Sequence, residues 1–295
     1  MAEKGGTHMQ TLTLTAHAKV NLALRITGRR ADGYHLLDMV NVSVALGDTL
    51  RLTRCEEGIS LAGGKDTPQG ADNLVWRAAE RLLRDFPGHG VRLTLEKRIP
   101  SQAGLGGGSA DAAAALCGLN ALWGLGLSLE ALQAYGLDLG ADVPYCVQGG
   151  PMRVTGVGER LQALPHAAPL YLALAKPKEG LSTAAVFAAY RMHPPLRQPD
   201  LDHTARALLA GDLTALAAAR GNSLEAAAVA LCPAIGQTLA ALDRTRPVCR
   251  GMTGSGSACF GLYDRAEEAA AAARRLADQG LWACATQSVS TGVDG

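Results

Sequence analysis

The sequence predicts an α+β protein, and three observations support this prediction. Segments with strand patterns and segments with helix patterns follow one another without strict β–α alternation, which favours α+β layers. An alternating, strand-like segment at residues 91–99 leads into a glycine-rich loop and then into an alanine-rich helix at residues 110–122. A second glycine loop, at residues 254–256, leads into an apolar strand.

Length, charge and composition narrow the classes of function. The 295-residue chain is long enough for a large core, and its texture changes after about residue 152, so we expect two domains. A net charge of +1 leaves no basic excess to attract phosphate backbones, and aromatic residues make up only 4% of the chain. We therefore expect no nucleic-acid partner and no membrane surface as a partner.

Cysteine usage and the start of the chain favour a cytoplasmic protein. The seven cysteines are odd in number and none lies three residues from another, which argues against a disulfide framework or a zinc cluster. The polar residues 1–9 resemble a tail or an expression remnant rather than a signal peptide. Residues 112–129 carry no charge, but their glycines favour a buried helix followed by a loop over a membrane span.

The first strand, expected over residues 12–24, carries two polar side chains. Lys19 and Asn21 are two residues apart, so they point to the same face. From the pattern alone they are either a functional pair or part of a solvated edge. After a glycine-containing turn, Tyr34 and His35 begin the next strand, where a ring can stack and an imidazole can hydrogen-bond. Spacing alone favours the alternative of a half-buried Tyr34 packing on its own strand.

Two strands and a helix are expected before the central loop. Residues 39–46 and 48–53 have the pattern of two strands joined around a glycine, and a polar, glycine-rich excursion follows them. Asp72 or Asn73 has the position of an N-cap for a helix at residues 74–84.

The glycine-rich loop at residues 99–111 has the features of an anion site. Its glycines let backbone N–H groups approach a ligand, and the following helix adds unpaired donors and a partial positive charge. Phosphate is the usual ligand of such a site. The spacing fits neither the dinucleotide-binding pattern nor the P-loop pattern. The alternative is a flexible linker or a tight turn.

Asp142 is a candidate base or metal ligand. It follows a short helix expected at residues 129–135 and lies in a Gly-Ala-Asp-Val-Pro turn, where Pro144 disfavours helix at Val143. An aspartate in such a turn is usually a cap or a turn former, and this plainer alternative stays open.

The second half of the chain is expected to be rich in helices. Strands are expected at residues 170–175 and 281–289. The expected helices cover residues 182–191, 202–210, 213–219, 224–231, a segment after Pro233, and residues 266–279.

Several of these motifs resemble those of the GHMP kinases. The resemblance extends over nearly the whole chain from Gln10. Its Lys-x-Asn, Asp-Gly-Tyr-His and Gly-Ala-Asp-Val-Pro motifs are specific to the branch that acts in the non-mevalonate route to isoprenoid precursors. The matching stretches are residues 18–22, 32–35, 100–112, 140–144, 222–225 and 253–257.

The resemblance implies a two-domain GHMP kinase fold of the α+β class. Residues 10–155 would form the ATP-binding, ribosomal-protein-S5-domain-2-like domain, and residues 156–295 a ferredoxin-like C-terminal domain. The implied activity is ATP- and Mg²⁺-dependent phosphorylation of the 2-hydroxyl of 4-diphosphocytidyl-2-C-methyl-D-erythritol, by a monomer or a homodimer. The alternatives are another GHMP kinase, of the homoserine or mevalonate type, and a non-catalytic nucleotide-sensing module. Only a cytidine-bearing substrate explains Tyr34 and His35, and a sensing module is expected to lack the Lys19–Asp142 pair.

The resemblance also implies roles for individual residues. Asp142 matches the base that takes the proton of the substrate hydroxyl, and Lys19 matches the lysine that keeps it ionised. The substrate-binding set comprises Asn21 at the erythritol, Tyr34, His35 and Phe187 at the cytosine, and Gly254, Ser255 and Gly256 over the diphosphate. The ATP-binding set comprises Asn73, Lys97, Pro100, Gly104, Leu105, Gly106, Gly107, Gly108, Ser109, Ala110 and Asp111.

Two positions depart from the family pattern. Many members have a second serine where this chain has Ala110, and some have asparagine where it has Asp111. A carboxylate repels phosphates unless a magnesium ion or a lysine intervenes. Asp111 is therefore expected to face away, to cap the helix or to help hold the metal.

Overall fold

The computed structural model describes residues 10–295 except 65–66, 69 and 166–167, so the expected tail at residues 1–9 lies outside the described residues. Strands and helices are both abundant and do not alternate strictly, which confirms the α+β class. The strands are β1 Thr11–Arg29, β2 His35–Cys55, β3 Gly58–Gly63, β4 Gly90–Glu96, β5 Met152–Gly156, β6 Arg160–Ala163, β7 Tyr171–Lys176, β8 Gly221–Asn222, β9 Cys249–Met252, β10 Cys259–Tyr263, β11 Trp282–Val289 and β12 Val293–Asp294. The helices are α1 Leu74–Asp85, α2 Gly107–Trp123, α3 Leu129–Leu139, α4 Val143–Gln148, α5 Thr183–Ala189, α6 Leu201–Ala210, α7 Leu213–Ala219, α8 Glu225–Leu231, α9 Pro233–Asp243 and α10 Ala266–Ala277, with a 3₁₀ turn at Gly70–Asp72.

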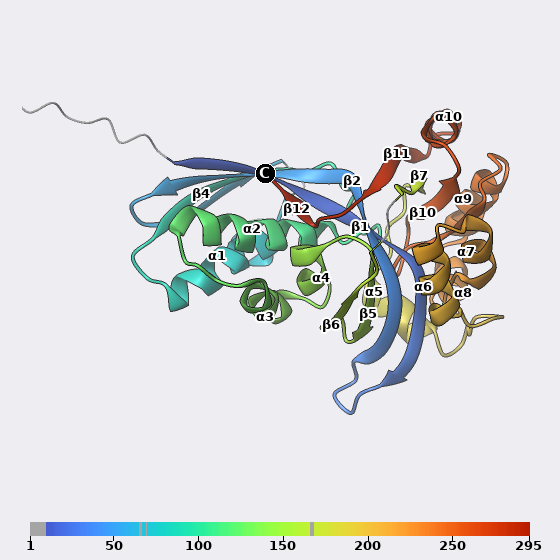
Figure 1. The fold of residues 1–295 in the computed structure, drawn as a ribbon, viewed down its shortest axis with the longest axis horizontal. Helices are drawn as coiled ribbons and strands as arrows, with labels where there is room; N and C mark the ends of the chain where they lie inside the picture. The colour runs from blue at the N-terminus through green and yellow to red at the C-terminus, as the bar shows by residue number, and fades with distance from the viewer. Residues whose placement is uncertain (1–9, 65–66, 69, 166–167) are drawn as a thin grey trace, which may run out of the picture.

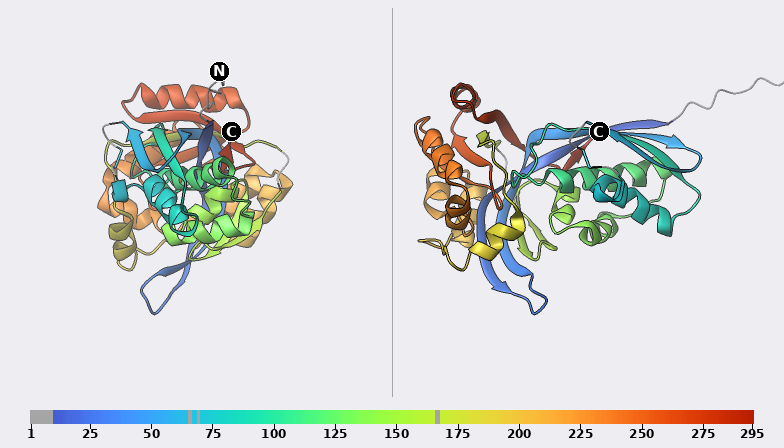
Figure 2. Two further views of the ribbon diagram at one scale, coloured as in Figure 1. Left: turned by 90° about the vertical axis from the view of Figure 1, so that its left-hand side faces the viewer. Right: turned by 180° about the vertical axis from the view of Figure 1, so that it is seen from behind.

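A long antiparallel hairpin of β1 and β2 connects two lobes. It pairs Thr11 with Thr53 at one end and Arg29 with His35 at the other. Figure 1 shows β4 and α1–α4 around one end of this hairpin, and β7, β10, β11 and α6–α10 beyond it. Figure 2 shows the same division from behind. Within the described residues the main strand order is β12-β1-β2-β11-β7-β10-β9, so β11 joins the two halves of the sheet. The domain boundary expected near residue 155 stays a prediction.

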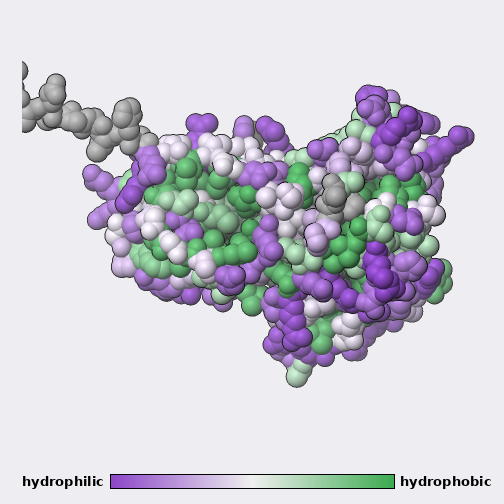
Figure 3. All heavy atoms as spheres, in the orientation of Figure 1, coloured by the Kyte–Doolittle hydropathy of each residue, from purple (hydrophilic) through white to green (hydrophobic). Residues whose placement is uncertain are grey.

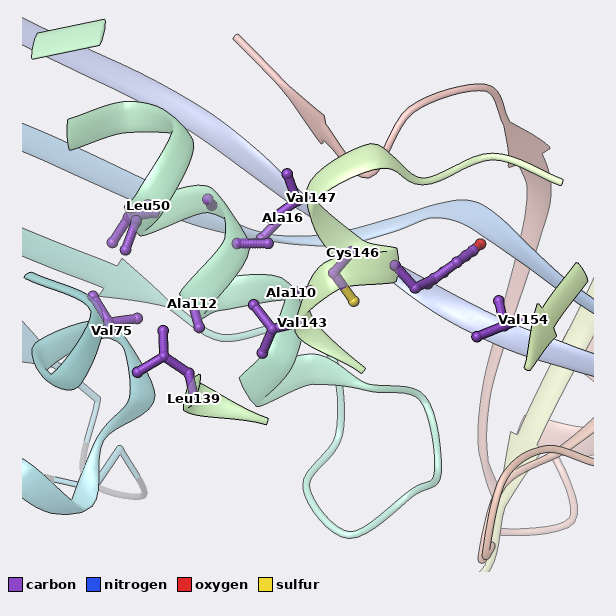
Figure 4. Close-up of a cluster of buried hydrophobic side chains, with 14 of the residues drawn as sticks. Ala16, Leu50, Val75, Ala110, Ala112, Leu139, Val143, Cys146, Val147 and Val154 are labelled. Atoms are coloured by element: carbon purple, nitrogen blue, oxygen red, sulfur yellow. The ribbon is translucent and has the colours of Figure 1, made fainter. Parts of the chain in front are cut away.

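The alanine-rich helix α2 forms the centre of the first lobe. It packs against β1, β2, α1 and α4, and its alanines at positions 110 and 112–115 are fully buried. Figure 4 shows Ala110 and Ala112 beside Val143 and Cys146 of α4, where small side chains allow the two helices to approach closely. The uncharged stretch is thus a buried helix followed by a loop, as predicted.

Neither α2 nor any other single helix in the described part of the chain could span a membrane by its length and composition. Among the described residues, no single helix is long and apolar enough to cross a membrane, and α8 and α9 meet the length and composition test only as a pair bent by 117°. Hydrophilic residues gather over α10 and along the β1–β2 hairpin on the face shown in Figure 3.

All seven cysteines are free.

The expected break between two strands at Gly47 is wrong, because β2 continues through it. The pairing with β1 shifts there by a bulge in β2, because His17 pairs with Gly47 and Ala18 with Val44. A Cβ on Gly47 would lie 2.7 Å from Thr15 Cγ2 and 2.9 Å from the Ala16 carbonyl oxygen, so glycine permits this close pairing.

Three other boundaries differ from the sequence prediction. The strand expected to reach Ile99 ends at Glu96. Beyond it, the backbone N–H groups of Arg98 and Ile99 donate hydrogen bonds to Asp48 Oδ1 instead of to a neighbouring strand. Helix α2 begins at Gly107 rather than at residue 110. Helix α4 begins at Val143, where a turn was expected, since a proline without an N–H is tolerated in the first turn of a helix.

The remaining helices agree with the prediction to within a few residues at each end. The short strands β3, β5, β6, β8, β9 and β12 were not predicted.

Candidate active site

A cavity of about 480 Å³ lies along the glycine loop. Its walls come from β1, from residues 99–109, from the starts of α2 and α4, and from loops of the second lobe. The lining includes Lys19, Asn73, Lys97, Pro100, Gly104, Leu105, Gly106, Gly107, Gly108, Ser109, Asp111, Asp142, Phe187, Gly254 and Ser255. Of the predicted site residues, the lining does not include Asn21, Tyr34, His35, Ala110 and Gly256.

The glycine loop holds its shape through close backbone approaches. Gly104 and Gly106 both have a φ of +72°. A Cβ on Gly104 would lie 2.3 Å from the Thr253 carbonyl oxygen, and one on Gly106 would lie 2.9 Å from Lys19 Cγ. Gly106 is also the N-cap of α2 and offers no side chain to the first-turn N–H groups, which stay available for an anion. The loop is therefore held in one defined conformation, and the alternative of a flexible linker is wrong.

Lys19 and Asp142 lie together at this cavity. Lys19 Nζ lies 3.6 Å from Asp142 Oδ2 and donates a hydrogen bond to Asn21 Oδ1 at 2.6 Å. Lys19 and Asn21 are buried, which overturns the solvated-edge alternative. Asp142 has the N-cap position of α4, yet its side chain makes no capping bond. Its carboxylate is thus free for another partner, and the capping alternative is wrong.

Thr253 links the second glycine loop, at residues 254–256, to Asn21 and to the first glycine loop, although it was not among the predicted site residues. The backbone N–H of Asn21 donates to Thr253 Oγ1 at 3.0 Å, and this hydroxyl donates to the Gly104 carbonyl oxygen at 3.2 Å. Its position directly before the second glycine loop was the only sequence signal for this role.

Lys97 lies between two carboxylates beside the glycine loop. Its Nζ donates to Asp111 Oδ2 at 2.5 Å and to Asp48 Oδ2. Burial raises the pKa of Asp111 to about 7, against the opposing effect of the Lys97 charge. Burial also disfavours the charged form of Lys97, but Asp111 and Asp48 outweigh it and raise the pKa of the ammonium. Asp111 therefore neither faces away from the site nor caps α2. Asp48 was not among the predicted site residues, because its contact with Lys97 joins residues that are far apart in the sequence.

Asn73 has a structural role at the edge of the cavity. Its Oδ1 accepts the N–H of Val75 at 2.8 Å, which makes it the N-cap of α1. Its Nδ2 donates to the Pro68 carbonyl oxygen at 2.9 Å. Both ends of the amide are therefore engaged, and the nucleotide contact expected for it stays a prediction.

An aromatic group lies at the other end of the site. The rings of His35 and Phe187 are stacked, with centroids 4.8 Å apart. Tyr34 is 65% exposed, so the half-buried alternative is wrong. Partial burial lowers the pKa of His35, and the charges of Arg29 and Arg191 act in the same direction.

Helix α5, which carries Phe187, is linked to the second glycine loop by a hydrogen bond. Thr183 Oγ1 lies 2.9 Å from Ser255 Oγ, within hydrogen-bond distance. The loop of Gly254, Ser255 and Gly256 and the aromatic group are therefore held on the same side of the site.

Comparison with known proteins gives a consistent result for this geometry. The model described as GHMP kinases N terminal domain matches residues 73–150, and the one described as GHMP kinases C terminal matches residues 204–280. A 4-diphosphocytidyl-2-C-methyl-D-erythritol kinase of Moorella thermoacetica is 46% identical over 275 residues, covering 91% of this chain and 95% of its own. The protein of the same name from Paramagnetospirillum magneticum is 41% identical over 294 residues, covering 96% of this chain and 100% of its own.

Solved structures show the same fold. The crystal structure of a 4-(cytidine 5'-diphospho)-2C-methyl-D-erythritol kinase matches with a TM-score of 0.79 and 35% identity, covering 94% of this chain and 100% of its own. A homoserine kinase from Cytophaga hutchinsonii matches with a TM-score of 0.76, covering 99% of each chain, but its 18% identity shows the fold alone. The two-domain GHMP kinase fold expected from the sequence is thereby confirmed. This chain belongs to the GHMP kinases and, among them, to the family of 4-diphosphocytidyl-2-C-methyl-D-erythritol kinases.

Proposed function

We propose that the protein transfers the terminal phosphoryl group of ATP to the 2-hydroxyl of 4-diphosphocytidyl-2-C-methyl-D-erythritol, with Asp142 as the base. The observation that carries the proposal is the Lys19–Asp142 pair, 3.6 Å apart, at a cavity lined by the glycine loop. Phosphoryl transfer depends mainly on positioning and on charge stabilisation. Asp142 takes the hydroxyl proton, and the Lys19 ammonium beside it orients the hydroxyl and stabilises negative charge.

The glycine loop is the ATP phosphate site in this proposal. The first-turn N–H groups of α2 face the phosphates, and the absence of Cβ atoms at Gly104 and Gly106 lets the backbone come close. A magnesium ion prefers oxygen ligands and would neutralise phosphate charge. The residues that fit it are Ser109, in the first turn of α2 at the cavity, and Asp111, whose buried Oδ1 has no hydrogen-bond partner among the described residues.

The aromatic group supports a substrate that carries a base. Phe187 is already stacked on His35, and the adjacent Tyr34 offers a further, exposed ring. A cytosine can stack on such rings and hydrogen-bond to an imidazole. Homoserine and mevalonate have no ring that would use these side chains.

The experiment is a comparison of three acceptors. ADP release is measured with ATP and 4-diphosphocytidyl-2-C-methyl-D-erythritol, mevalonate or homoserine. We expect turnover only with the cytidine-bearing acceptor, and ³¹P spectroscopy of the product should place the new phosphate on the 2-hydroxyl. Turnover with mevalonate or homoserine alone would overturn the proposed substrate.

A further inference from the structure

Asn41 is a fully buried amide on β2, paired with Asn21 across the β1–β2 hairpin. Its Oδ1 accepts a hydrogen bond from Asn21 Nδ2 at 2.7 Å. Its own Nδ2 has no partner in the part of the chain that the structure describes. A buried donor without a partner costs free energy, which an apolar side chain of similar size would avoid. The oxygen is therefore the part of the Asn41 amide that the structure uses.

The direction of the Asn21 amide matters because its two ends differ chemically. An ammonium can only donate, so Lys19 requires the Asn21 oxygen, which it reaches at 2.6 Å. Asn21 Nδ2 must then point toward β2. There it donates to Asn41 Oδ1 and, at 3.3 Å, to the sulfur of Met39, which is a weak acceptor.

We infer that Asn41 is a positioning residue for the reaction, which orients the Asn21 amide so that its oxygen holds Lys19 beside Asp142. Asn41 is not among the residues that line the cavity, so its effect on turnover passes through Asn21. The inference rests on the roles proposed above for Lys19 and Asp142. It adds an amide on β2 to the cluster of Lys19, Asn21 and Asp142, whose members come from β1 and the start of α4.

The test compares Asn41→Leu with Asn41→Asp. Leucine has a similar size but no acceptor, and we expect kcat to fall about tenfold, the scale of losing one oriented hydrogen bond, with the KM for ATP unchanged. Aspartate keeps an acceptor oxygen at the same place and should recover most of the lost kcat. Asn41→Ala, which adds no bulk, should show the same loss as leucine and serves if the leucine variant does not fold.

A double-mutant cycle shows whether Asn41 acts through Asn21. In an Asn21→Ala background, Asn41→Leu should have no further effect on kcat. Thr238→Val is the control, because Thr238 is a buried hydroxyl on α9 that bonds the Ala234 carbonyl oxygen and does not line the cavity. It should lower Tm and leave kcat unchanged.

Two results separate this inference from the proposed function. If Lys19→Ala and Asn21→Ala lose turnover while Asn41→Leu keeps the parent kcat, the inference about Asn41 is overturned and the proposed function stands. If Lys19→Ala keeps full turnover, the proposed role of Lys19 fails. Additive losses in the cycle would also overturn the inference, since they would show that Asn41 acts independently of Asn21.

Discussion

Lys19 Nζ lies 3.6 Å from Asp142 Oδ2, although one residue is in the middle of β1 and the other is at the start of α4. The two side chains are held differently. The Lys19 side chain is 5% exposed and bonds Asn21, whereas the Asp142 side chain is 35% exposed and makes no capping bond. The cation is therefore fixed while the carboxylate can meet a ligand, which suits a general base.

Replacing Asp142 by asparagine removes the base and keeps the shape of the side chain. We expect kcat to fall by about 10²–10⁴-fold, the usual contribution of a positioned general base, with little change in the KM for ATP. ADP release and a nucleotide titration measure the two effects. Asp138→Asn on α3 is the matched control, because that side chain is 60% exposed and pairs with Arg81. Parent turnover in Asp142→Asn would exclude Asp142 as the base.

Tyr34→Ala should weaken the cytidine end of the site alone. Stacking of a base on an aromatic ring contributes about 1–3 kcal/mol, so we expect the KM for the cytidine substrate to rise about tenfold. Because the cytosine is remote from the transferred phosphate, kcat and the KM for ATP should change little. Tyr34→Phe keeps the ring and should resemble the parent. An unchanged KM in Tyr34→Ala would show that the exposed ring does not contact the substrate.

The KM for the cytidine substrate should depend on pH through His35. Partial burial, Arg29 and Arg191 lower its pKa below the usual value, so the imidazole stays neutral at neutral pH and gains a proton only in more acidic solution. A neutral imidazole can both donate and accept, whereas the protonated ring only donates. We expect a constant KM above about pH 6.5 and a rising KM below it. His35→Asn should lack this rise, and a rise that persists in this variant would assign it to another group.

Capping of α1 by Asn73 can be separated from nucleotide binding. Asn73→Ala removes the acceptor for the Val75 N–H and should lower the free energy of unfolding by about 1 kcal/mol. Asn73→Ser keeps a capping oxygen and should unfold near the parent temperature. Denaturant unfolding measures both variants. A normal KM for ATP in the serine variant, which lacks the amide, would contradict the nucleotide role predicted for Asn73.

The sequence predicts the parts of this site that depend on local pattern. The two-residue spacing of Lys19 and Asn21 predicts their common face, and the order of strand, loop and helix predicts the anion site. The contacts of Lys97 with Asp48 and Asp111 depend on which strands and helices become neighbours, and no local pattern records that.

Errors in the predicted elements have the same origin. The continuity of β2 through Gly47 depends on its pairing with β1, which leaves residues 45 and 46 of β2 as a bulge. Helix α4 begins at Val143 although the following proline disfavours it, because packing against α2 and α3 outweighs a local preference. Tertiary contacts decide both cases, and they are not visible in the segments themselves.

Gly106 and Gly124 mark the two ends of α2 and provide a matched pair of substitutions. Both have left-handed backbones, with φ values of +72° and +65°. Alanine should therefore strain each by about 1–2 kcal/mol and lower Tm to a similar extent. Their surroundings differ, because a Cβ on Gly106 would lie 2.9 Å from Lys19 Cγ, whereas one on Gly124 would meet nothing within 4 Å. We expect Gly106→Ala to displace Lys19 from Asp142 and to lower kcat about tenfold or more, the effect of a small misplacement in a catalytic site. Gly124→Ala should keep the parent kcat. Equal losses of kcat in the two variants would show that strain at the ends of α2, and not the place of Lys19, controls turnover.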